Sequence, residues 1–367
     1  MRCNGDSMWG QSANLYSKQD AIMTKGMAIL CMVVLHLFCR TGNDVFGTPL
    51  VWINETTPLV FLFGFFAEIC VPIYSMCAGY AQQFFREQGR LSWKSNVRRI
   101  IKLLVNYWIV LFLFCGISFF LDIDPSIPGT LTDFIKSIIL MHSYNGAWWY
   151  LNTYILLLLI PPQILLWPIK KLEYQQGLVF CLLLQVGWYF ITRLNMIPSI
   201  LQEISVVVFL EKEIVNLLSI LPYIWCGAFL CKGRLVEKCY SWMRRHISDK
   251  SYNLVLLLLW GALFICTNLI HKAVLFGIVS VLSFLIFNLL RKSKSVKIFL
   301  FLGKHSTNIW LTHMFFYSCL FKGLVIIVRY PLFILLFMFL LCIMTSYVIM
   351  GIEGIIYKLC NKKIITN

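Results

Sequence analysis

The sequence predicts an all-α membrane protein, a polytopic bundle of about ten transmembrane helices with both chain termini in the cytoplasm. Of its 367 residues, 59% are hydrophobic and 13% are charged, whereas a soluble domain carries roughly 25% charged residues. The apolar residues form continuous runs, such as 254–260 and 332–342. In lipid a chain satisfies its backbone polar groups only as a helix or as a closed β-barrel. A membrane β-barrel needs alternating apolar and polar residues, so these continuous runs predict helices. The lipid bilayer is therefore the expected surrounding of most of the chain.

Ten apolar runs approach the length of about 20 residues that one crossing needs. They are 21–39, 58–83, 99–121, 148–167, 177–195, 214–231, 252–270, 273–290, 302–321 and 331–357. Pro222 interrupts the sixth run, since proline removes a helical hydrogen bond. The polar start of the chain lacks the pattern of a cleaved signal peptide. We expect residues 1–20 to be a cytoplasmic segment, 21–357 a single integral membrane domain and 358–367 a cytoplasmic tail.

The formal net charge of +16 is spread over the connections between the apolar runs. When the runs alternate from a cytoplasmic N-terminus, 25 of the 32 Lys and Arg residues fall on the inner side. This is the positive-inside bias of membrane proteins, and it favours an even number of crossings. A nucleic-acid partner is not expected, because the basic residues form no single stripe or arm. The 14 cysteines lie mostly inside the runs without zinc spacing, so no metal is expected.

Two ionisable residues in the first run, Lys25 and His36, point to chemistry within the membrane. They are eleven residues apart, which is about 16 Å along a helix and close to three turns, so both lie on one face. Histidine is the side chain best suited to take a proton from a hydroxyl near neutral pH. The structural alternatives are that Lys25 extends to the inner interface and that His36 bonds to a neighbouring helix.

Six segments resemble, in the same order, landmarks of the acyltransferase-3 family of integral membrane acyltransferases. They are 20–36 with Asp20, Lys25 and His36; 71–80 (VPIYSMCAGY); 98–108 with Arg98 and Arg99; 148–151 (WWYL); 223–230 with Gly227; and 302–313 with Ser306 and His313. The resemblance extends over roughly residues 20 to 350. The chain departs from the family at Lys25, where arginine is usual, and at Cys77 and Ala78, where leucine and serine are usual.

The resemblance implies transfer of an acyl group, commonly acetyl from acetyl-CoA, to hydroxyls of cell-surface carbohydrates. It implies that Lys25 and His36 are the essential pair. His36 would act as general base on the acceptor hydroxyl or carry the acyl group itself. Acetyl-CoA would be the donor substrate, a carbohydrate the acceptor, and a bacterial plasma membrane the location. Lysine lacks the planar fork of arginine, which affects the donor-side role of Lys25 more than the role of His36.

The other matched residues have a functional and a structural interpretation each. Arg98 and Arg99 would bind the phosphates of CoA or anchor the helix at the inner surface. Trp149, with Trp148 and Tyr150, would stack on a sugar or belong to an outer aromatic belt.

Three polar residues of the apolar runs complete the set of candidates. Ser306 would orient a substrate or cap the ninth helix. His313 would orient the donor or the acceptor, or bond to a neighbouring helix. Glu68 would orient His36 if the second helix packs against the first at that depth.

Two other classes of protein remain open from the sequence. A transporter or flippase for a lipid-linked saccharide would show broken helices in matching halves, and no inverted repeat is evident. A glycan polymerase would favour a large outer loop, whereas the predicted outer loops are short. Either class would make the Lys25–His36 spacing a coincidence.

Overall fold

The predicted all-α class is confirmed. The computed structural model describes residues 16–193, 205–270, 275–293 and 297–365, and these residues form helices and loops without a β-strand. Residues 1–15, most of the predicted N-terminal segment, lie outside the described residues, as do 366–367 in the predicted tail and the start of the eighth run.

Seven helices in the described part of the chain are long and apolar enough to cross a membrane, which supports a multi-pass membrane protein. One of them is continuous in space but consists of α2 (Leu59–Phe66), the short 3-10 turn η2 (Ala67–Ile69) and α3 (Cys70–Glu87). The other six are α1 (Lys18–Phe38), α4 (Trp93–Leu121), α9 (Tyr174–Arg193), α10 (Ser205–Lys232), α12 (Asp249–Ile270) and α15 (Pro331–Ile365).

Three of the ten predicted crossings correspond to helices that are shorter or more polar than expected. In the fourth, α6 (Trp149–Leu159) ends before Pro161, and its eleven residues reach about 16 Å, half of the hydrocarbon core. In the eighth, the apolar part of α13 (Phe276–Ser293) is Phe276–Leu290. In the ninth, α14 (Lys297–Met314) contains several polar side chains.

The sixth predicted crossing is longer than expected and is not interrupted. Helix α10 continues through Pro222 from Ser205 to Lys232. Neighbouring helices and local adjustments re-satisfy the backbone groups that a proline frees, so proline is tolerated within helices of membrane proteins. The predicted break at Pro222 is therefore wrong.

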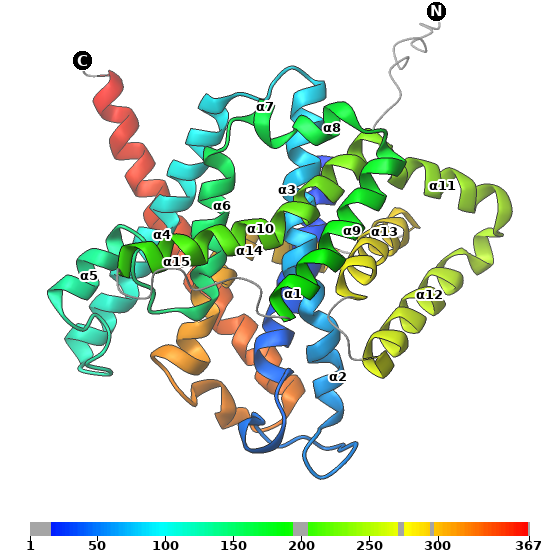
Figure 1. Ribbon diagram of the computed structural model, residues 1–367. Coiled ribbons are helices and arrows are strands. Elements are labelled where there is room, and N and C mark those ends of the chain that lie inside the picture. Colours follow the sequence, from blue (N-terminus) through cyan, green and yellow to red (C-terminus); the bar gives the residue numbers. More distant parts are fainter. Residues whose placement is uncertain (1–15, 194–204, 271–274, 294–296, 366–367) are drawn as a thin grey trace, which may run out of the picture.

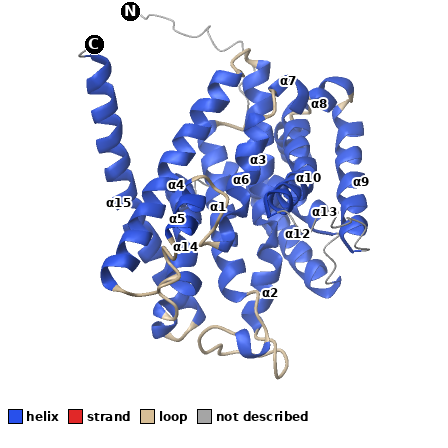
Figure 2. Cartoon of the chain, turned by 60° about the vertical axis from the view of Figure 1, so that its left-hand side comes forward, coloured by secondary structure: helices blue, strands red, loops and turns tan. Residues whose placement is uncertain are grey.

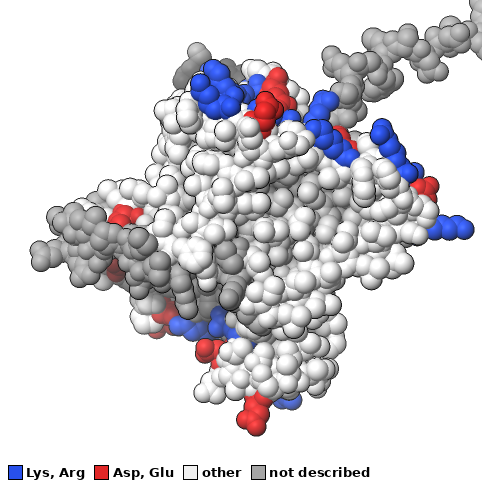
Figure 3. Space-filling view, turned by 45° about the vertical axis from the view of Figure 1, so that its right-hand side comes forward, with Lys and Arg blue, Asp and Glu red and all other residues white. Residues whose placement is uncertain are grey.

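Short elements join the long helices at the two ends of the bundle. They are η1 (Gly42–Asp44), α5 (Leu131–Ile138), η3 (Gly146–Trp148), α7 (Pro162–Leu165), α8 (Trp167–Lys171), α11 (Leu235–His246), the π-helical turn η5 (Phe315–Cys319) and η6 (Leu324–Val328). The start of α1 and the end of α15 lie at one end of the bundle, with α7, α8 and α11 (Figure 1; Figure 2). On the face in Figure 3, charged side chains gather at the two ends and leave a broad uncharged band between them.

Helix α1 begins earlier than the predicted residue 21 because a capping box forms there. The Ser17 side chain accepts from the Asp20 backbone N–H, and the Asp20 carboxylate accepts from the Ser17 N–H at 2.7 Å. This arrangement satisfies two backbone donors that would otherwise have no partner at a helix start.

Glycine allows two pairs of helices to approach backbone to backbone. Where α1 meets α14, a Cβ on Gly26 would lie 2.0 Å from the Phe299 carbonyl oxygen, and one on Gly303 would lie 1.9 Å from that of Ile22. Helices α3 and α10 meet in the same manner, through Gly79 and Gly227. Small residues at such crossings maximise packing where lipid offers no hydrophobic driving force between helices.

Candidate active site

The most polar buried surface in the described chain belongs to α14. Its buried residues are Leu302, Gly303, His305, Ser306, Asn308, Ile309, Trp310, Leu311, Thr312 and His313. Polar groups within a membrane bundle are costly and mark functional positions. The buried polar face of α14 is therefore where we expect the chemistry to take place.

His36 of α1 and His313 of α14 lie together, although 277 residues separate them. Their ring centroids are 5.0 Å apart and the rings are inclined at 42°. His313 is 1% exposed, whereas His36 is half-buried. The ring nitrogens of His36 form no hydrogen bond with the described residues, so they are available to a bound molecule.

The hydrogen bonds of His313 determine which of its nitrogens holds a lone pair. Nδ1 lies 2.9 Å from the Trp310 carbonyl oxygen and 3.1 Å from that of Ile309. A carbonyl oxygen only accepts, so Nδ1 carries the proton, and Nε2 of the neutral ring is an acceptor. Nε2 is buried without a hydrogen-bond partner in the described chain. A ligand hydroxyl or thiol could supply the missing donor.

Arg40 and Tyr317 border the histidine pair and were not among the predicted site residues. The Arg40 guanidinium lies 4.4 Å from the Phe46 ring centroid and 5.6 Å from that of Tyr317, and Nε donates to the His36 carbonyl oxygen at 3.2 Å. Arg40 and Tyr317 each follow one of the two histidines by four residues. Residues four apart are neighbours on one face of a helix, so this spacing is the signal that could have identified Tyr317. Arg40 lies beyond the end of α1 at Phe38, so helical spacing does not place it.

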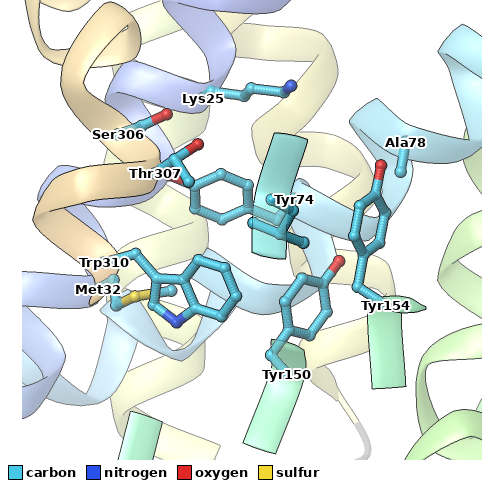
Figure 4. A pocket seen from close by; sticks show the side chains of 10 residues that line it. Lys25, Met32, Tyr74, Ala78, Tyr150, Tyr154, Ser306, Thr307 and Trp310 are labelled. Atoms are coloured by element: carbon cyan, nitrogen blue, oxygen red, sulfur yellow. The ribbon is translucent and has the colours of Figure 1, made fainter. Parts of the chain in front are cut away.

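A cavity of about 100 Å³ lies beside Lys25, between five helices (Figure 4). It is lined by Lys25, Met32, Tyr74, Ala78, Leu103, Tyr150, Tyr154, Ser306, Thr307 and Trp310. Lys25 is exposed to this space and forms no ion pair with the described residues. The cavity extends to Met32, one turn before His36, and to Trp310, three residues before His313. It thus connects the lysine with the neighbourhood of the histidine pair.

The wall of this cavity combines hydroxyl groups with aromatic rings. The Tyr150 hydroxyl is 3.1 Å from Ser75 Oγ, and Ser306 Oγ donates to the Gly303 carbonyl oxygen at 2.9 Å. In Figure 4 the hydroxyls of Ser306 and Thr307 lie on the same side as the Lys25 ammonium. The cavity therefore offers one cation and several donors to an elongated polar ligand.

Ser306 lies inside α14 and does not cap it. The helix begins at Lys297, nine residues earlier, and Ser306 is 3% exposed. The alternative that Ser306 caps the ninth helix is therefore wrong, and the side chain lines the cavity instead.

Arg98 and Arg99 occupy different surroundings on α4. Arg98 is exposed and forms no hydrogen bond or ion pair with a described side chain, whereas Arg99 is half-buried with its guanidinium 5.1 Å from the Phe85 ring centroid. Arg99 also lies within electrostatic range of Tyr154, which lines the Lys25 cavity. Of the two arginines, Arg99 is the one placed near the cavity.

The three aromatic residues that start α6 are not equivalent. Trp148 and Tyr150 are 3% and 8% exposed, and the Trp148 indole donates to the Leu311 carbonyl oxygen at 3.0 Å. These two are buried in protein, so they do not form an outer belt in contact with lipid. Trp149 is half-buried and packs edge-on against Tyr150, with ring centroids 5.7 Å apart.

Glu68 lies in η2, between α2 and α3, and is half-buried. It lies near Cys39 and Cys70. In the described chain no hydrogen bond joins Glu68 to His36, whose neighbours include His313 and Arg40.

A buried hydrogen-bond network crosses from α14 to α4 and α15. His305 Nδ1 lies 2.8 Å from Ser346 Oγ, Asn308 donates to the same oxygen at 3.0 Å, and Asn106 donates to Asn308 at 3.0 Å. The network fixes α14 against two neighbouring helices. Within the described residues, no group of three or more His, Cys, Asp or Glu side chains could hold a metal ion.

One comparison with known proteins gave a match. A family model described as an acyltransferase domain, the acyltransferase-3 model, matches residues 22–351. No curated protein and no solved structure matches the chain. The matched segment includes α1, with Lys25 and His36, and α14, with Ser306 and His313.

Proposed function

Because this chain belongs to the acyltransferase family whose model covers residues 22–351, we propose that it is a membrane O-acyltransferase that acetylates a cell-surface carbohydrate. The donor is cytoplasmic acetyl-CoA, and the acceptor is a carbohydrate hydroxyl on the opposite side of the membrane. The observation that carries the proposal is that the cavity lined by Lys25 extends to Met32 and Trp310, in the neighbourhood of the paired imidazoles of His36 and His313.

Lys25 and Arg99 hold the anionic part of the donor in this proposal. The Lys25 ammonium faces the cavity without an ion-pair partner in the described chain, and Arg99 lies near Tyr154 in the cavity wall. An acyl-CoA carries phosphates at one end and its thioester at the other. With the phosphates near the start of α1, the thioester extends past Met32 and Trp310 toward the histidines.

His36 is the general base for the transfer. It takes the proton of the acceptor hydroxyl while the oxygen attacks the thioester carbonyl carbon. The carbon–sulfur bond then breaks, and the protonated His36 returns its proton to the departing thiolate, so the products are an ester and free CoA. His313 Nε2, the lone pair without a partner in the described chain, accepts a hydrogen bond from a second hydroxyl of the acceptor and so orients it. General acid–base catalysis of this kind contributes about 10²–10⁴ in rate.

Arg40 stabilises the negative charge that develops on the carbonyl oxygen during the attack. Its guanidinium lies against Tyr317 and donates to the His36 backbone, which holds it beside the imidazoles. A fixed positive group at a developing oxyanion acts strongly in a site that excludes water.

The membrane arrangement that suits this reaction has ten crossings, both termini in the cytoplasm, and a bacterial plasma membrane as its location. The end of the bundle where α1 starts also holds α8, with Lys170 and Lys171, and α11, with Arg244 and Arg245 in its last turn. Basic residues favour the cytoplasmic side, so Lys25 faces the cytoplasm and His36 the outer leaflet. A fluorescent reporter that matures only in the cytoplasm, fused after the tail, tests this orientation.

The test of the function uses purified protein in nanodiscs, radiolabelled acetyl-CoA and a glycan extract. Wild-type protein transfers label to the glycan, and His36→Ala reduces transfer by about 10²-fold or more. His246→Ala is the matched control, because His246 is exposed on α11 and bonds only to its own helix. Label that stays on the protein without acceptor indicates an acyl-histidine intermediate. Well-folded wild-type protein that neither hydrolyses acetyl-CoA nor transfers acetyl disproves the proposal.

A further inference from the structure

A second cavity, of about 240 Å³, lies between α4, α6, α10 and the loop after α5. Its lining residues are Tyr107, Leu140, Met141, His142, Ser143, Gly146, Trp148, Trp149, Leu151, Asn152, Phe209, Lys212 and Glu213. Ser143, Gly146 and Lys212 are exposed, so the cavity reaches the surface. Trp149 of this cavity packs against Tyr150 of the Lys25 cavity, and the two rings form a shared wall.

Glu213 is the polar side chain in this cavity that needs a hydrogen-bond donor from a ligand. It is 4% exposed. Its Oε1 accepts from Asn152 Nδ2 at 3.3 Å, and its Oε2 is buried without a hydrogen-bond partner in the described chain. The nearby Thr153 hydroxyl donates to the Trp149 carbonyl oxygen at 2.9 Å, so its proton is not available to Glu213. A buried acceptor left without a donor is destabilising.

The charges around Glu213 do not supply that donor. Lys212 is the next residue along α10 but is exposed, and no ion pair joins Glu213 to a described cation. A bound molecule with a hydroxyl at Oε2 would supply the missing hydrogen-bond donor.

The other walls of the cavity suit a ring with one apolar face and polar edges. The half-buried Trp149 indole offers an aromatic surface, and the Asn152 side-chain carbonyl oxygen and the His142 imidazole offer hydrogen bonds at its sides. A pyranose has this character, because its C–H groups form a face and its hydroxyls radiate from the edge. Ligand sites commonly combine a largely apolar wall with a few placed polar groups. The volume is adequate for one sugar ring and too small for a long chain.

The cavity also lies close to the histidine end of α14. A Cβ on Gly146 would be 3.6 Å from Met314 Cε, and Met314 directly follows His313. The Trp148 indole, which forms part of the wall, is bonded to the Leu311 carbonyl oxygen. A sugar in this cavity would therefore be separated from the helix that carries His313 by Gly146 and Trp148.

We propose that this cavity binds a sugar ring of the acceptor, with Glu213 accepting a hydrogen bond from a sugar hydroxyl and Trp149 stacking on the ring. The acceptor role rests on the proposed acyltransferase function. The sugar-binding site itself does not, so the two can fail separately.

The experiment measures the binding of a panel of methyl pyranosides to the protein in nanodiscs by calorimetry, with acetyl-CoA hydrolysis followed in parallel. Glu213→Gln keeps the shape of the side chain and weakens pyranoside binding by about 10-fold or more. Trp149→Ala weakens it as well. Glu211→Gln is the matched control, because Glu211 is two residues away on α10 and does not line the cavity. The Glu211→Gln control keeps both pyranoside binding and the rate of acetyl-CoA hydrolysis.

Three results would overturn the proposal. In the first, Glu213→Gln leaves pyranoside binding unchanged. In the second, a wild-type protein that hydrolyses acetyl-CoA binds no pyranoside. In the third, the protein binds tetramethylammonium in place of sugars, which would make Glu213 part of a cation site. If pyranosides bind in a Glu213-dependent manner but acetyl-CoA is not hydrolysed, the sugar site stands and the acyltransferase function fails.

Discussion

His36 and His313 meet because α1 and α14 already touch at Gly26 and Gly303, and each glycine lies ten residues before the histidine of its own helix. The glycine contact and the histidine contact are therefore separated by the same number of residues on both helices. This equal spacing means that α1 and α14 run in the same direction and in register. The backbone contact at the glycines leaves no room to slide one helix along the other. The geometry of the imidazole pair therefore depends on two residues about 15 Å away that carry no side chain.

Gly303→Ala is expected to lower stability and disturb the histidine pair. The new Cβ would lie 1.9 Å from the Ile22 carbonyl oxygen, a backbone atom that yields only if the helices separate. Overpacking of this kind typically costs about 1–3 kcal/mol. Thermal unfolding in detergent measures the change. Gly351→Ala on α15 is the control, because nothing lies within 4 Å of its Cβ position. Equal unfolding temperatures for the two variants would contradict the argument.

Part of this arrangement could be predicted from the sequence. The all-α class, the first helix and the Lys25–His36 spacing follow from local apolar runs and helical geometry. The pairing of His36 with His313 does not, because it depends on a contact between residues 277 positions apart. Gly26 and Gly303 did not predict this contact from the sequence, since a glycine in a helix indicates a close approach only when the helix packed against it is known.

The errors have local causes as well. Pro222 was expected to break a helix, but the rule applies to a helix in water, and neighbouring helices surround α10. An aromatic belt was one of the two interpretations of Tyr150 from its sequence position, and it is excluded because the Tyr150 hydroxyl lies 3.1 Å from Ser75 Oγ within the bundle. Glu213 was not predicted as a site residue, because its importance comes from an oxygen without a partner, which only the packed structure shows.

His313→Gln is expected to reduce acetyl transfer by about 10- to 100-fold without unfolding the protein, because His313 contributes one hydrogen bond and not the proton transfer. Glutamine keeps a hydrogen-bonding side chain of similar reach but has no nitrogen lone pair comparable to Nε2. Transfer and thermal unfolding are measured on the same preparation. His305→Gln serves as the comparison, since His305 bonds to Ser346 and lies in the structural network. We expect that variant to lose stability more than catalysis, and a His313→Gln variant with wild-type turnover would exclude a catalytic role for His313.

Lys25→Met is expected to raise the KM for acetyl-CoA by about 10-fold, because the cavity loses its cation. Lys25→Arg should keep or improve donor binding, since a guanidinium grips phosphate at two points. Initial rates at several salt concentrations separate charge from packing, because attraction between exposed charges weakens with salt. Lys304→Met is the control, as Lys304 is exposed and does not line the cavity. If Met and Arg at position 25 gave the same KM, the ammonium would not bind the donor.

Arg99→Gln and Arg98→Gln form a matched pair that distinguishes donor binding from membrane anchoring. The two residues are adjacent and carry the same charge, but the half-buried Arg99 lies against Phe85 and near Tyr154, while Arg98 is exposed. Anchoring at the inner surface depends on charge near the helix end, so it predicts similar effects for both variants. Donor binding predicts that Arg99→Gln raises the KM for acetyl-CoA by about 10-fold or more, because a hydrogen bond to a charged group contributes about 1.5–3 kcal/mol. It also predicts that Arg98→Gln leaves the KM within about twofold. Kinetics with both variants at equal expression decide between these predictions. A larger effect from Arg98 would place the phosphates on the outer face of α4 and not at the Lys25 cavity.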